Sequence, residues 1–383
     1  MSLRRVLVLA DESVDWVIAG LRQLDRIALS IDEFAVDNDE KGPVLVCILW
    51  RADLEQSQRW IPVHPRLTHL AFTTDLEAEP YDLVLDTRLF VYRKAIKDLI
   101  ESRPGPASAT SWENYVRLAE PVPPARARSW EYIRSGSEID RVEAEFLRAS
   151  GKSQDGFVSR YLNRPISRLV TRFLLRHPIT PNDWTWLLSP VPLIAALLMA
   201  RGNYWSFVWG LVLFQIFSIL DGCDGEIARA KFMESERGRR LDDLFDVLSN
   251  IFLALGLGVG LRHAHPHFGG LYLAEGLATA LLIVLNEWCL AKQEPAGASA
   301  KPNSLGETLY PRHREMIARS GLLKLGEGFA SALIQSTKRD VAVLFFVVLA
   351  VVGWPALILH LLFVVTAITL GIALGGSRAP SRD

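Results

Sequence analysis

Hydrophobic residues are distributed very differently in the two halves of this 383-residue sequence. Residues 1–155 alternate short apolar runs with charged and proline-containing segments, whereas long uncharged runs dominate from Trp184 onward. Runs of this length indicate helices that cross a membrane. The candidate spans are residues 184–200, 204–220 with a polar extension, 242–261, 268–285, 341–353 with an N-terminal extension, and 355–374.

Several of these uncharged cores are shorter than the ~20 residues that a helix needs to cross a bilayer. The second and third spans reach that length only if they include a group of aspartates. Polar groups at membrane depth must lie in protein or in a water-filled cavity, because lipid cannot solvate them. We therefore expect the polar ends of these two helices to face a cleft.

The first 150 residues have the pattern of a soluble domain. Apolar runs at residues 6–10, 44–49, 67–72 and 83–85 are suited to strands, with helical periodicity between them. Such alternation predicts an α/β sandwich. The fold class is therefore an α-helical integral membrane protein of six transmembrane helices with an N-terminal soluble α/β domain. The expected parts are a cytosolic domain (1–150), a juxtamembrane helix (151–180) and a membrane domain (181–383).

Lysine and arginine predict the orientation in the membrane. Residues 291–340 carry eight of them, whereas the loops on the opposite side offer only Arg201 and Arg262. By the positive-inside rule, the N-terminus, the aspartates, residues 291–340 and the C-terminus face the cytoplasm at the cell (inner) membrane. The even number of spans agrees with this prediction.

A basic helix is expected just before the first span, over residues 157–176. Arginine recurs there every four residues, among apolar side chains, which favours a helix on the anionic leaflet. The alternative is a basic helix packed on the soluble domain. The arginines are Arg160, Arg164, Arg168, Arg172 and Arg176.

Composition excludes some classes of protein. The net charge of −1 gives no support for nucleic-acid binding. The three cysteines are scattered without a C-x-x-C pair, which disfavours a disulfide framework or a zinc site and fits a reducing, cytosolic face. The apolar core of the first ten residues is too short for a signal peptide.

An acidic motif joins the second and third spans. It reads D-x2-D-G-x2-A-R-x8-G-x3-D-x3-D from Asp221 to Asp246. At residue frequencies of roughly one in fifteen, its fixed positions recur by chance about once in a few billion windows. Carboxylates at membrane depth are costly and rarely lack a function.

The spacing of the aspartates suggests a cation site. Asp221 and Asp224 share one helix face, and Asp242 and Asp246 share another. Four converging carboxylates would repel one another unless cations lay between them. Oxygen ligands favour Mg²⁺, then Mn²⁺ or Ca²⁺, and such Mg²⁺ usually also binds water and a substrate phosphate. The cluster therefore predicts a phosphate-bearing substrate.

Other residues of the motif fit the same interpretation. Gly225 and Gly238 allow a ligand or a helix to approach closely, and Arg229 could hold phosphate oxygens. Asp243 points about 100° away from Asp242 and is expected to be interfacial rather than a ligand. Alternatively, the aspartates only pair with Arg229, Arg237, Arg239 and Arg240 at a solvated helix end.

The motif resembles that of the CDP-alcohol phosphotransferases, six-helix membrane enzymes that transfer a substituted phosphate from a CDP-linked donor to an alcohol acceptor and release CMP. The resemblance extends over about residues 152–375. It implies two Mg²⁺ ions held by Asp221, Asp224 and Asp242, with Asp246 as a ligand of the second ion or as the general base. It also implies a nucleotide pocket of Gly225, Ala228, Arg229 and Gly238.

The stretch I-T-P-N-D-W-T, residues 179–185, is similar to the family's entry into its first span. The resemblance implies that Asn182 and Thr185 approach the nucleotide. The alternative is that they cap the helix.

The substrates are less closely specified. Residues 152–167 resemble the juncture of inositol-phosphate-using members, similar to di-myo-inositol phosphate phosphate synthases, which are often fused to a nucleotidyltransferase. Arg339 is a candidate to bind an acceptor phosphate; alternatively, it pairs with Asp340 or anchors the interface. Two substrate pairs stay open: CDP-diacylglycerol with a polar acceptor would give a phospholipid, and a CDP-polyol with inositol phosphate would give a soluble phosphodiester.

The soluble domain also carries a resemblance. Residues 137–147 are similar to the closing helix of sugar-phosphate nucleotidyltransferases. The first strand, however, is followed by Asp11, Glu12 and Asp15 instead of a glycine-rich loop, and these acids would repel a triphosphate. We therefore expect a degenerate, catalytically silent domain.

A different class of function is a cation transporter or metal-binding membrane protein, because acids within membranes often line ion paths. The acids here cluster at one membrane face, which disfavours that alternative. Glu275 is the one candidate acid in mid-span, and a local hydrogen bond would explain it. The partners expected are the CDP-linked donor, the alcohol acceptor and the lipid bilayer, without nucleic acid; a homodimer is common among similar enzymes.

Overall fold

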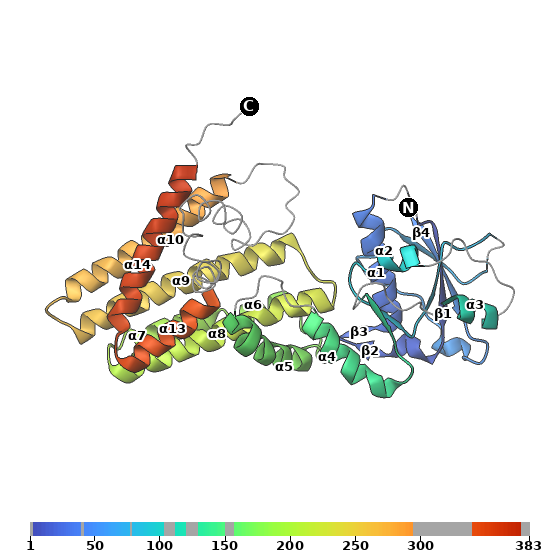
Figure 1. Ribbon diagram of the computed structural model, residues 1–383, viewed down its shortest axis with the longest axis horizontal. Helices are drawn as coiled ribbons and strands as arrows, with labels where there is room; N and C mark the ends of the chain where they lie inside the picture. The colour runs from blue at the N-terminus through green and yellow to red at the C-terminus, as the bar shows by residue number, and fades with distance from the viewer. Residues whose placement is uncertain are drawn as a thin grey trace, which may run out of the picture. The chain divides into compact units, whose positions relative to one another are not determined.

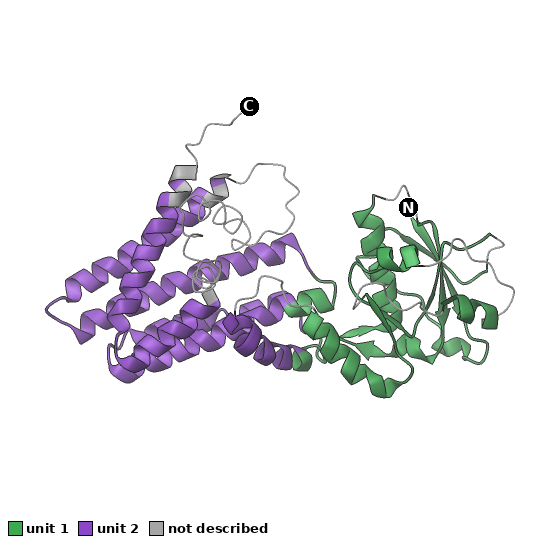
Figure 2. Cartoon of the chain, in the orientation of Figure 1, with its two compact units in different colours: residues 1–151, 172–178, 226–233 green, residues 152–171, 179–225, 234–383 purple. Residues whose placement is uncertain are grey.

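The computed structural model describes residues 3–39, 42–76, 79–102, 112–119, 129–149, 157–293 and 339–376. The chain divides into two compact units (Figure 2). Unit 1 contains the N-terminal α/β domain and two short segments from later in the sequence. Its parts are Met1–Gly151, Arg172–Pro178 and Glu226–Met233, and unit 2 contains Lys152–Thr171, Ile179–Gly225 and Glu234–Asp383.

Unit 1 is built on a four-stranded parallel sheet of order β5-β4-β1-β6 (Figure 1). The central strand β1 is completely apolar after its first residue, as expected of a strand covered on both faces. The expected α/β class is therefore confirmed for the N-terminal region, although β5 begins at Leu70 instead of residue 67. The strands are β1 (Arg5–Ala10), β4 (Val44–Trp50), β5 (Leu70–Thr73) and β6 (Leu83–Asp86).

Helices and two small antiparallel pairs complete unit 1. Helix α3 packs on β1 and β6, where Leu7, Val84 and Tyr115 join one buried cluster. The antiparallel pairs are β2 (Val17–Ile18) with β3 (Leu21–Arg22), and β7 (Leu89–Val91) with β8 (Trp130–Tyr132). The helices are α1 (Gln23–Asp37), α2 (Ile96–Ser102), α3 (Trp112–Ala119) and α4 (Ile139–Ala149).

The expected basic helix is present as α5 (Arg164–Leu174). Its apolar side chains form an exposed stripe that includes Leu169, 72% exposed, and Phe173, 61% exposed. Arg172 in its last turn pairs with Asp140 and Glu143 of α4, the latter at 3.0 Å. The stripe suits a membrane surface, whereas Arg172 holds the end of the helix to the α/β domain.

Unit 2 is helical, and three of its described helices are long and apolar enough to cross a membrane: α8, α9 and residues Gly269–Cys289 of α10. The apolar parts of α13 and α14 are shorter. Its main helices are α6 (Pro181–Leu188), α7 (Pro190–Met199), α8 (Tyr204–Ala230), α9 (Glu236–Ala264), α10 (Gly269–Gln293), α13 (Arg339–Val352) and α14 (Pro355–Gly376).

The first expected span, residues 184–200, is not one helix. It is divided into α6 and α7 at Ser189–Pro190. Proline has no N–H to continue the hydrogen bonding of a preceding helix, but it is tolerated in the first turn of a new one. The expectation of a continuous span was therefore wrong, because Pro190 starts a second helix.

The core of unit 2 joins α7, α8, α9, α13 and α14 around side chains such as Phe214 and Leu257. Helix α9 approaches its neighbours very closely through glycines. A Cβ atom at Gly260 would lie 2.2 Å from the carbonyl oxygen of Met199, and one at Gly258 would lie 3.1 Å from the Cα of Gly276. Small residues permit such backbone contact between helices in membranes.

Candidate active site

The acidic motif lies at adjoining ends of two antiparallel helices. The ring of Phe207 near the start of α8 packs where a side chain at Gly260, near the end of α9, would stand. Asp224 follows Phe207 by about 26 Å of helix, and Asp242 precedes Gly260 by about 27 Å. The two halves of the motif therefore lie at the same end of the bundle.

The short helix α6 touches both halves of the motif. The indole N–H of Trp184 donates to the carbonyl oxygen of Leu220 at 2.9 Å. On its other side, the Trp186 ring meets Phe245 of α9 edge to face, with ring centroids 5.2 Å apart. Since α6 reaches α8 and α9 with neighbouring side chains, it helps to set their separation.

Thr185 and Asn182, both predicted from the sequence, lie against the motif. The Thr185 hydroxyl donates to Oδ2 of Asp224 at 2.8 Å, and a Cβ atom at Gly238 would lie 3.1 Å from Oδ1 of Asn182. Neither residue caps α6, because Thr180 does so in a capping box with Asp183. The capping alternative was therefore wrong for both.

Asp224 is buried, whereas Asp221, Asp242 and Asp246 are half-buried. Besides Thr185, Asp224 accepts from the backbone N–H of Gly225. Within the described residues, no three acidic, histidine or cysteine side chains are gathered closely enough to hold a metal ion. The donor set, which consists only of carboxylates on two neighbouring helix ends, fits a hard divalent cation in its chemistry.

Two arginines near the motif, Arg239 and Arg240, form ion pairs with acids that are not among its four aspartates. Arg239 pairs with Asp243 at 3.4 Å, and Arg240 pairs with Glu236 at 2.5 Å. Both partners lie outside the four motif aspartates. The interfacial position of Asp243 stays a prediction from its place on the helix.

Arg164 of α5 lies beside α8. From the sequence, this arginine was expected to face the anionic leaflet. Arg164 is buried, and its Nη1 lies 3.5 Å from where a Cβ atom at Gly222 would stand. The thiol of Cys223 contacts the Ser167 carbonyl oxygen at 3.5 Å. Arg160 and Arg176 are exposed and Arg168 and Arg172 are half-buried, so the burial of Arg164 follows from tertiary packing, which a four-residue repeat does not reveal.

Glu287 on α10 is a second residue that the sequence analysis missed. The hairpin of α9 and α10 brings Gly258 against Gly276. Counting from that contact, Asp246 and Glu287 lie at the same level to within about 2 Å. The Glu287 carboxylate interacts electrostatically with Asp243 and Asp246. An acid near the end of an apolar run was the only sequence signal for it.

Three other residues were predicted for the site: Ala228, Arg229 and Arg339. Ala228 and Arg229 lie on α8 in the segment that belongs to unit 1. Arg339 begins α13, but its side chain lies outside the described residues, as do residues 294–338 of the basic segment. Asp340, proposed above as an alternative partner for Arg339, accepts from the backbone N–H of Ser159 at 2.5 Å.

Glu275 makes the local hydrogen bond expected of it. Its Oε1 lies 2.7 Å from Nδ1 of His360 on α14. The interaction joins two helices of unit 2, and it accounts for an acid within an apolar span without an ion path.

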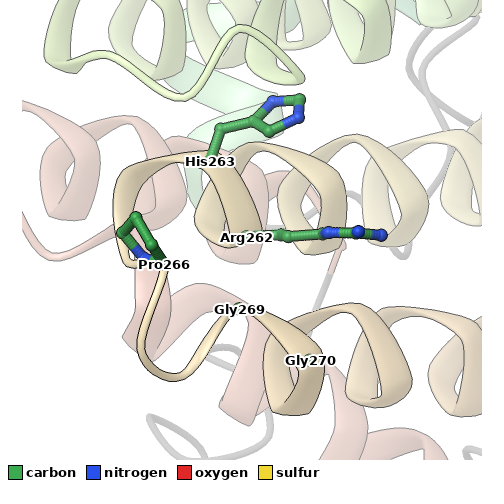
Figure 3. A pocket seen from close by; sticks show the side chains of 5 residues that line it. All are labelled: Arg262, His263, Pro266, Gly269 and Gly270. Atoms are coloured by element: carbon green, nitrogen blue, oxygen red, sulfur yellow. The ribbon is translucent and has the colours of Figure 1, made fainter.

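A pocket of about 520 Å³ lies at the other end of α9, in its turn into α10 (Figure 3). Arg262 and His263 point to different sides of α9 there, and Nδ1 of His263 lies 2.7 Å from the Ala200 carbonyl oxygen. Arg262 is about 24 Å along the helix from Asp246. This pocket is therefore separate from the acidic motif.

Comparison with known proteins found a family match over about a third of the chain. Residues 181–311 match the family model described as CDP-alcohol phosphatidyltransferase. Three similar proteins carry the name bifunctional IPC transferase and DIPP synthase. The one from Archaeoglobus fulgidus is 32% identical over 175 residues, which cover 45% of this chain and 33% of the relative.

The other two matches have similar extents. The protein from Thermococcus kodakarensis is 38% identical over 128 residues, 33% of this chain and 28% of the relative. The one from Aquifex aeolicus is 29% identical over 170 residues, 44% of this chain and 38% of the relative. The chain thus spans about a third of the length of the curated relatives it matches.

Proposed function

We propose that the chain, whose residues 181–311 match the family model described as CDP-alcohol phosphatidyltransferase, transfers a substituted phosphate from a CDP-alcohol to an alcohol acceptor and releases CMP. The observation that carries this proposal is the placement of the complete acidic motif at adjoining ends of α8 and α9, with α6 in contact with both. An acidic helix end of this kind suits a diphosphate bound together with divalent cations.

Divalent cations, Mg²⁺ by preference and two in number, would be held by Asp221, Asp224, Asp242 and Asp246. When bound, they supply positive charge to a diphosphate and to the CMP oxygen that leaves. The hydroxyl of Thr185 orients the Asp224 carboxylate, as a donor behind a metal ligand does. Gly225, Gly238 and Asn182, and on the resemblance Ala228 and Arg229, are the residues proposed to bind the nucleotide.

Asp246 is proposed as the general base. The acceptor oxygen forms a bond to the phosphorus that carries the donor's alcohol group, and the bond from that phosphorus to the bridging oxygen breaks. The electron pair of the broken bond leaves with CMP, while the proton of the acceptor hydroxyl passes to Asp246. No oxidant, reductant or further reactant is required.

We propose inositol phosphate as the acceptor and a CDP-polyol as the donor. Two observations support this choice: the juncture at residues 152–167, and relatives that are named IPC transferase and DIPP synthase. Arg339 is retained as the residue that binds the acceptor phosphate. CDP-diacylglycerol with a polar acceptor is the substrate pair against which this choice is tested.

We propose that unit 2 spans the cell membrane six times, with the acidic motif on the cytoplasmic side. Support comes from the three long apolar helices and the two shorter ones, with α6 and α7 together as the sixth crossing, and from the uneven distribution of lysine and arginine. The exposed stripe of α5, with Leu169 and Phe173, would rest on the cytoplasmic leaflet.

The α/β domain is proposed to be catalytically silent. Ligands of parallel sheets bind beyond the carboxyl ends of the strands, where Arg51 and Arg88 follow β4 and β6. Both arginines are paired with acids from the loop after β1: Arg88 with Asp11 at 2.7 Å, and Arg51 with Glu12 at 2.7 Å. A triphosphate would have to displace these carboxylates.

The proposed function is tested by following CMP release from the purified protein with Mg²⁺. Candidate donors are CDP-inositol and CDP-diacylglycerol, each offered with inositol phosphate, inositol or glycerol phosphate. We expect release with the CDP-polyol and inositol phosphate. Release only with CDP-diacylglycerol would replace the substrates, and no release with any pair, together with cation flux in vesicles, would favour a transporter.

A further inference from the structure

The last residues of α8 belong to unit 1, which contains the α/β domain, whereas the rest of the helix belongs to unit 2. Residues Glu226–Met233 belong to unit 1, together with Arg172–Pro178 (Figure 2). The first half of the acidic motif ends within this segment at Arg229. The second half begins at Gly238, just after Ser235 caps α9.

Arg26 on α1 holds this segment by its backbone. Its side chain is completely buried. Nη2 donates to the carbonyl oxygen of Ile18 at 2.7 Å and to that of Ala230 at 3.2 Å. The second bond joins residues 204 positions apart, and its acceptor is the last residue of α8.

Aromatic rings surround the rest of the Arg26 guanidinium. Its Cζ lies 5.0 Å from the ring centroid of Phe90, 5.2 Å from that of Phe146 and 5.9 Å from that of Phe232. Nε and Nη1 have no hydrogen-bond partner within the described part of the chain. The rings lie around the cation, and Glu143 and Arg93 also act on it through their charges. Cation–π attraction is strongest in such desolvated surroundings.

The two residues that follow Ala230 are also held in place by contacts. Phe232 is buried, adopts a left-handed φ of 54°, and has the Arg93 guanidinium 5.0 Å from its ring centroid. Lys231 is buried, and its Nζ donates to the carbonyl oxygen of His177 at 2.9 Å. A left-handed residue other than glycine persists only where its surroundings impose it.

A gain in stability does not readily explain why the charge of Arg26 is buried. Taking a guanidinium out of water is costly, and apolar residues of similar volume often stabilise a core as well or better. Burial lowers the pKa of Arg26 to about 9. What an apolar residue could not provide is a directed donor to the Ala230 carbonyl oxygen, so the arginine is suited to fixing the position of that segment.

We propose that Arg26 is a positioning residue for phosphate transfer: through Ala230 and Phe232, the α/β domain fixes the connection between the two halves of the acidic motif. Only Lys231–Glu234 separate α8 from the N-cap of α9. A connection this short passes a displacement at Ala230 on to the start of α9, which carries Asp242 and Asp246. The inference rests on the proposed function only for its kinetic measurement.

The test uses the full-length protein with two substitutions on opposite sides of the contact, Arg26→Met and Phe232→Leu. Phe232 lies outside the core of the sheet, so its substitution tests the proposal even if Arg26→Met does not fold. Arg22→Ala is the matched control, because this arginine is exposed, lies near the start of α1 and stacks on Trp60.

The first measurement is independent of activity. Lys231 is 6% exposed, so trypsin should cut after it slowly in the wild-type protein and in Arg22→Ala. We expect both test variants to be cut there about tenfold faster or more, since proteolysis reports local opening. Wild-type cleavage rates at Lys231 in a folded test variant would overturn the proposal.

The second measurement is kinetic. A displacement of reacting groups by about 1 Å can cost up to a hundredfold in rate. We therefore expect kcat of both test variants to fall about tenfold or more, with KM for either substrate changed less than about threefold, as for groups misplaced in the transition state. Arg26→Lys, which keeps a cation and a donor, should recover part of kcat.

The outcomes separate the positioning role of Arg26 from the proposed function. Faster cleavage at Lys231 with an unchanged kcat would overturn the positioning role, because the contact would then hold only the domain. If the wild-type protein releases no CMP, the proposed function fails while the cleavage result still decides whether Arg26 holds the connection.

Discussion

The protein has two groups of carboxylates at places where ligands commonly bind, and they are held in different ways. In the α/β domain, Asp11 and Glu12 at the carboxyl edge of the sheet are neutralised by Arg88 and Arg51. On α8, Asp224 accepts hydrogen bonds from Thr185 and the Gly225 amide. Neutral donors orient a carboxylate without cancelling its charge. In the first arrangement arginines pair with the acids, and in the second a hydroxyl and an amide orient the carboxylate.

Asp246→Asn should have the largest effect of any single substitution. Loss of a general base typically costs about 10²–10⁴ in rate, so CMP release should become barely measurable while binding of the CDP-alcohol, measured by calorimetry, persists. Asp243→Asn is the matched control, three residues away and paired with Arg239. A near-normal rate for Asp246→Asn would refute its role as base.

Thr185→Val tests whether a neutral donor matters to Asp224. Removing the hydroxyl leaves a buried carboxylate less well oriented, so the Mg²⁺ concentration for half-maximal CMP release should rise about tenfold. Thr185→Ser retains the hydroxyl and should stay within about twofold of the wild type. Equal behaviour of the valine and serine variants would show that this hydrogen bond has no part in metal binding.

Glu287→Gln probes the carboxylate that α10 adds near Asp246. The substitution removes one negative charge, and solvent screens part of the attraction between that charge and a cation at the motif. The Mg²⁺ concentration for half-maximal activity should therefore rise only about threefold. The matched control is Glu275→Gln, in the same helix but paired with His360 at another level. Equal Mg²⁺ requirements for the Glu287 variant and the wild type would exclude Glu287 from the site.

The paired acids of the α/β domain should respond to substitution through stability and not through catalysis. Asp11→Asn removes one of the two carboxylates that pair with Arg88 in a half-buried place and should lower the free energy of unfolding by about 2 kcal/mol. The urea midpoint of unfolding measures this change. CMP release per folded molecule should be unchanged, and a lower turnover of the folded variant would argue against a silent domain.

The pH dependence of stability gives the smallest expected effect. Burial alone would raise the pKa of Asp11, but hydrogen bonds from Ser13 and the Arg88 guanidinium outweigh it and leave the pKa below its ordinary value of 3.8. The stabilisation from this group is therefore complete above that value and is lost as the pH falls through the folded-state pKa. Thermal unfolding between pH 5 and 3 should show a shallower decline for Asp11→Asn than for the wild type.

The sequence predicted secondary structure well where the hydrophobic pattern of a single segment determines that structure. Residues 6–10, 44–49 and 83–85 form strands because each is a short apolar run covered by helices. The run at 67–72 begins later, at Leu70, because the backbone N–H of His69 donates to Asp32 rather than to a strand. The division of the first span follows from Pro190, whose effect on a helix could have been read from the sequence.

The candidate site was foreseen only in part, for a related reason. The aspartates were predicted from their spacing within the motif, and Thr185 from the resemblance of residues 179–185 to the family's entry into its first span. Arg26, Arg164 and Glu287 were not, since each reaches its partners through packing between elements far apart in the chain. The periodicity of one segment does not show which residues of distant segments will contact it.

The glycine contacts of α9 have a consequence for motion within the bundle. At Gly260 even a methyl group would overlap the backbone of Met199, so this end of the helix has no room to slide or to accept a larger residue. Helix α9 is therefore anchored to α7 at this end, and Asp242 lies about 27 Å along the helix from that anchor.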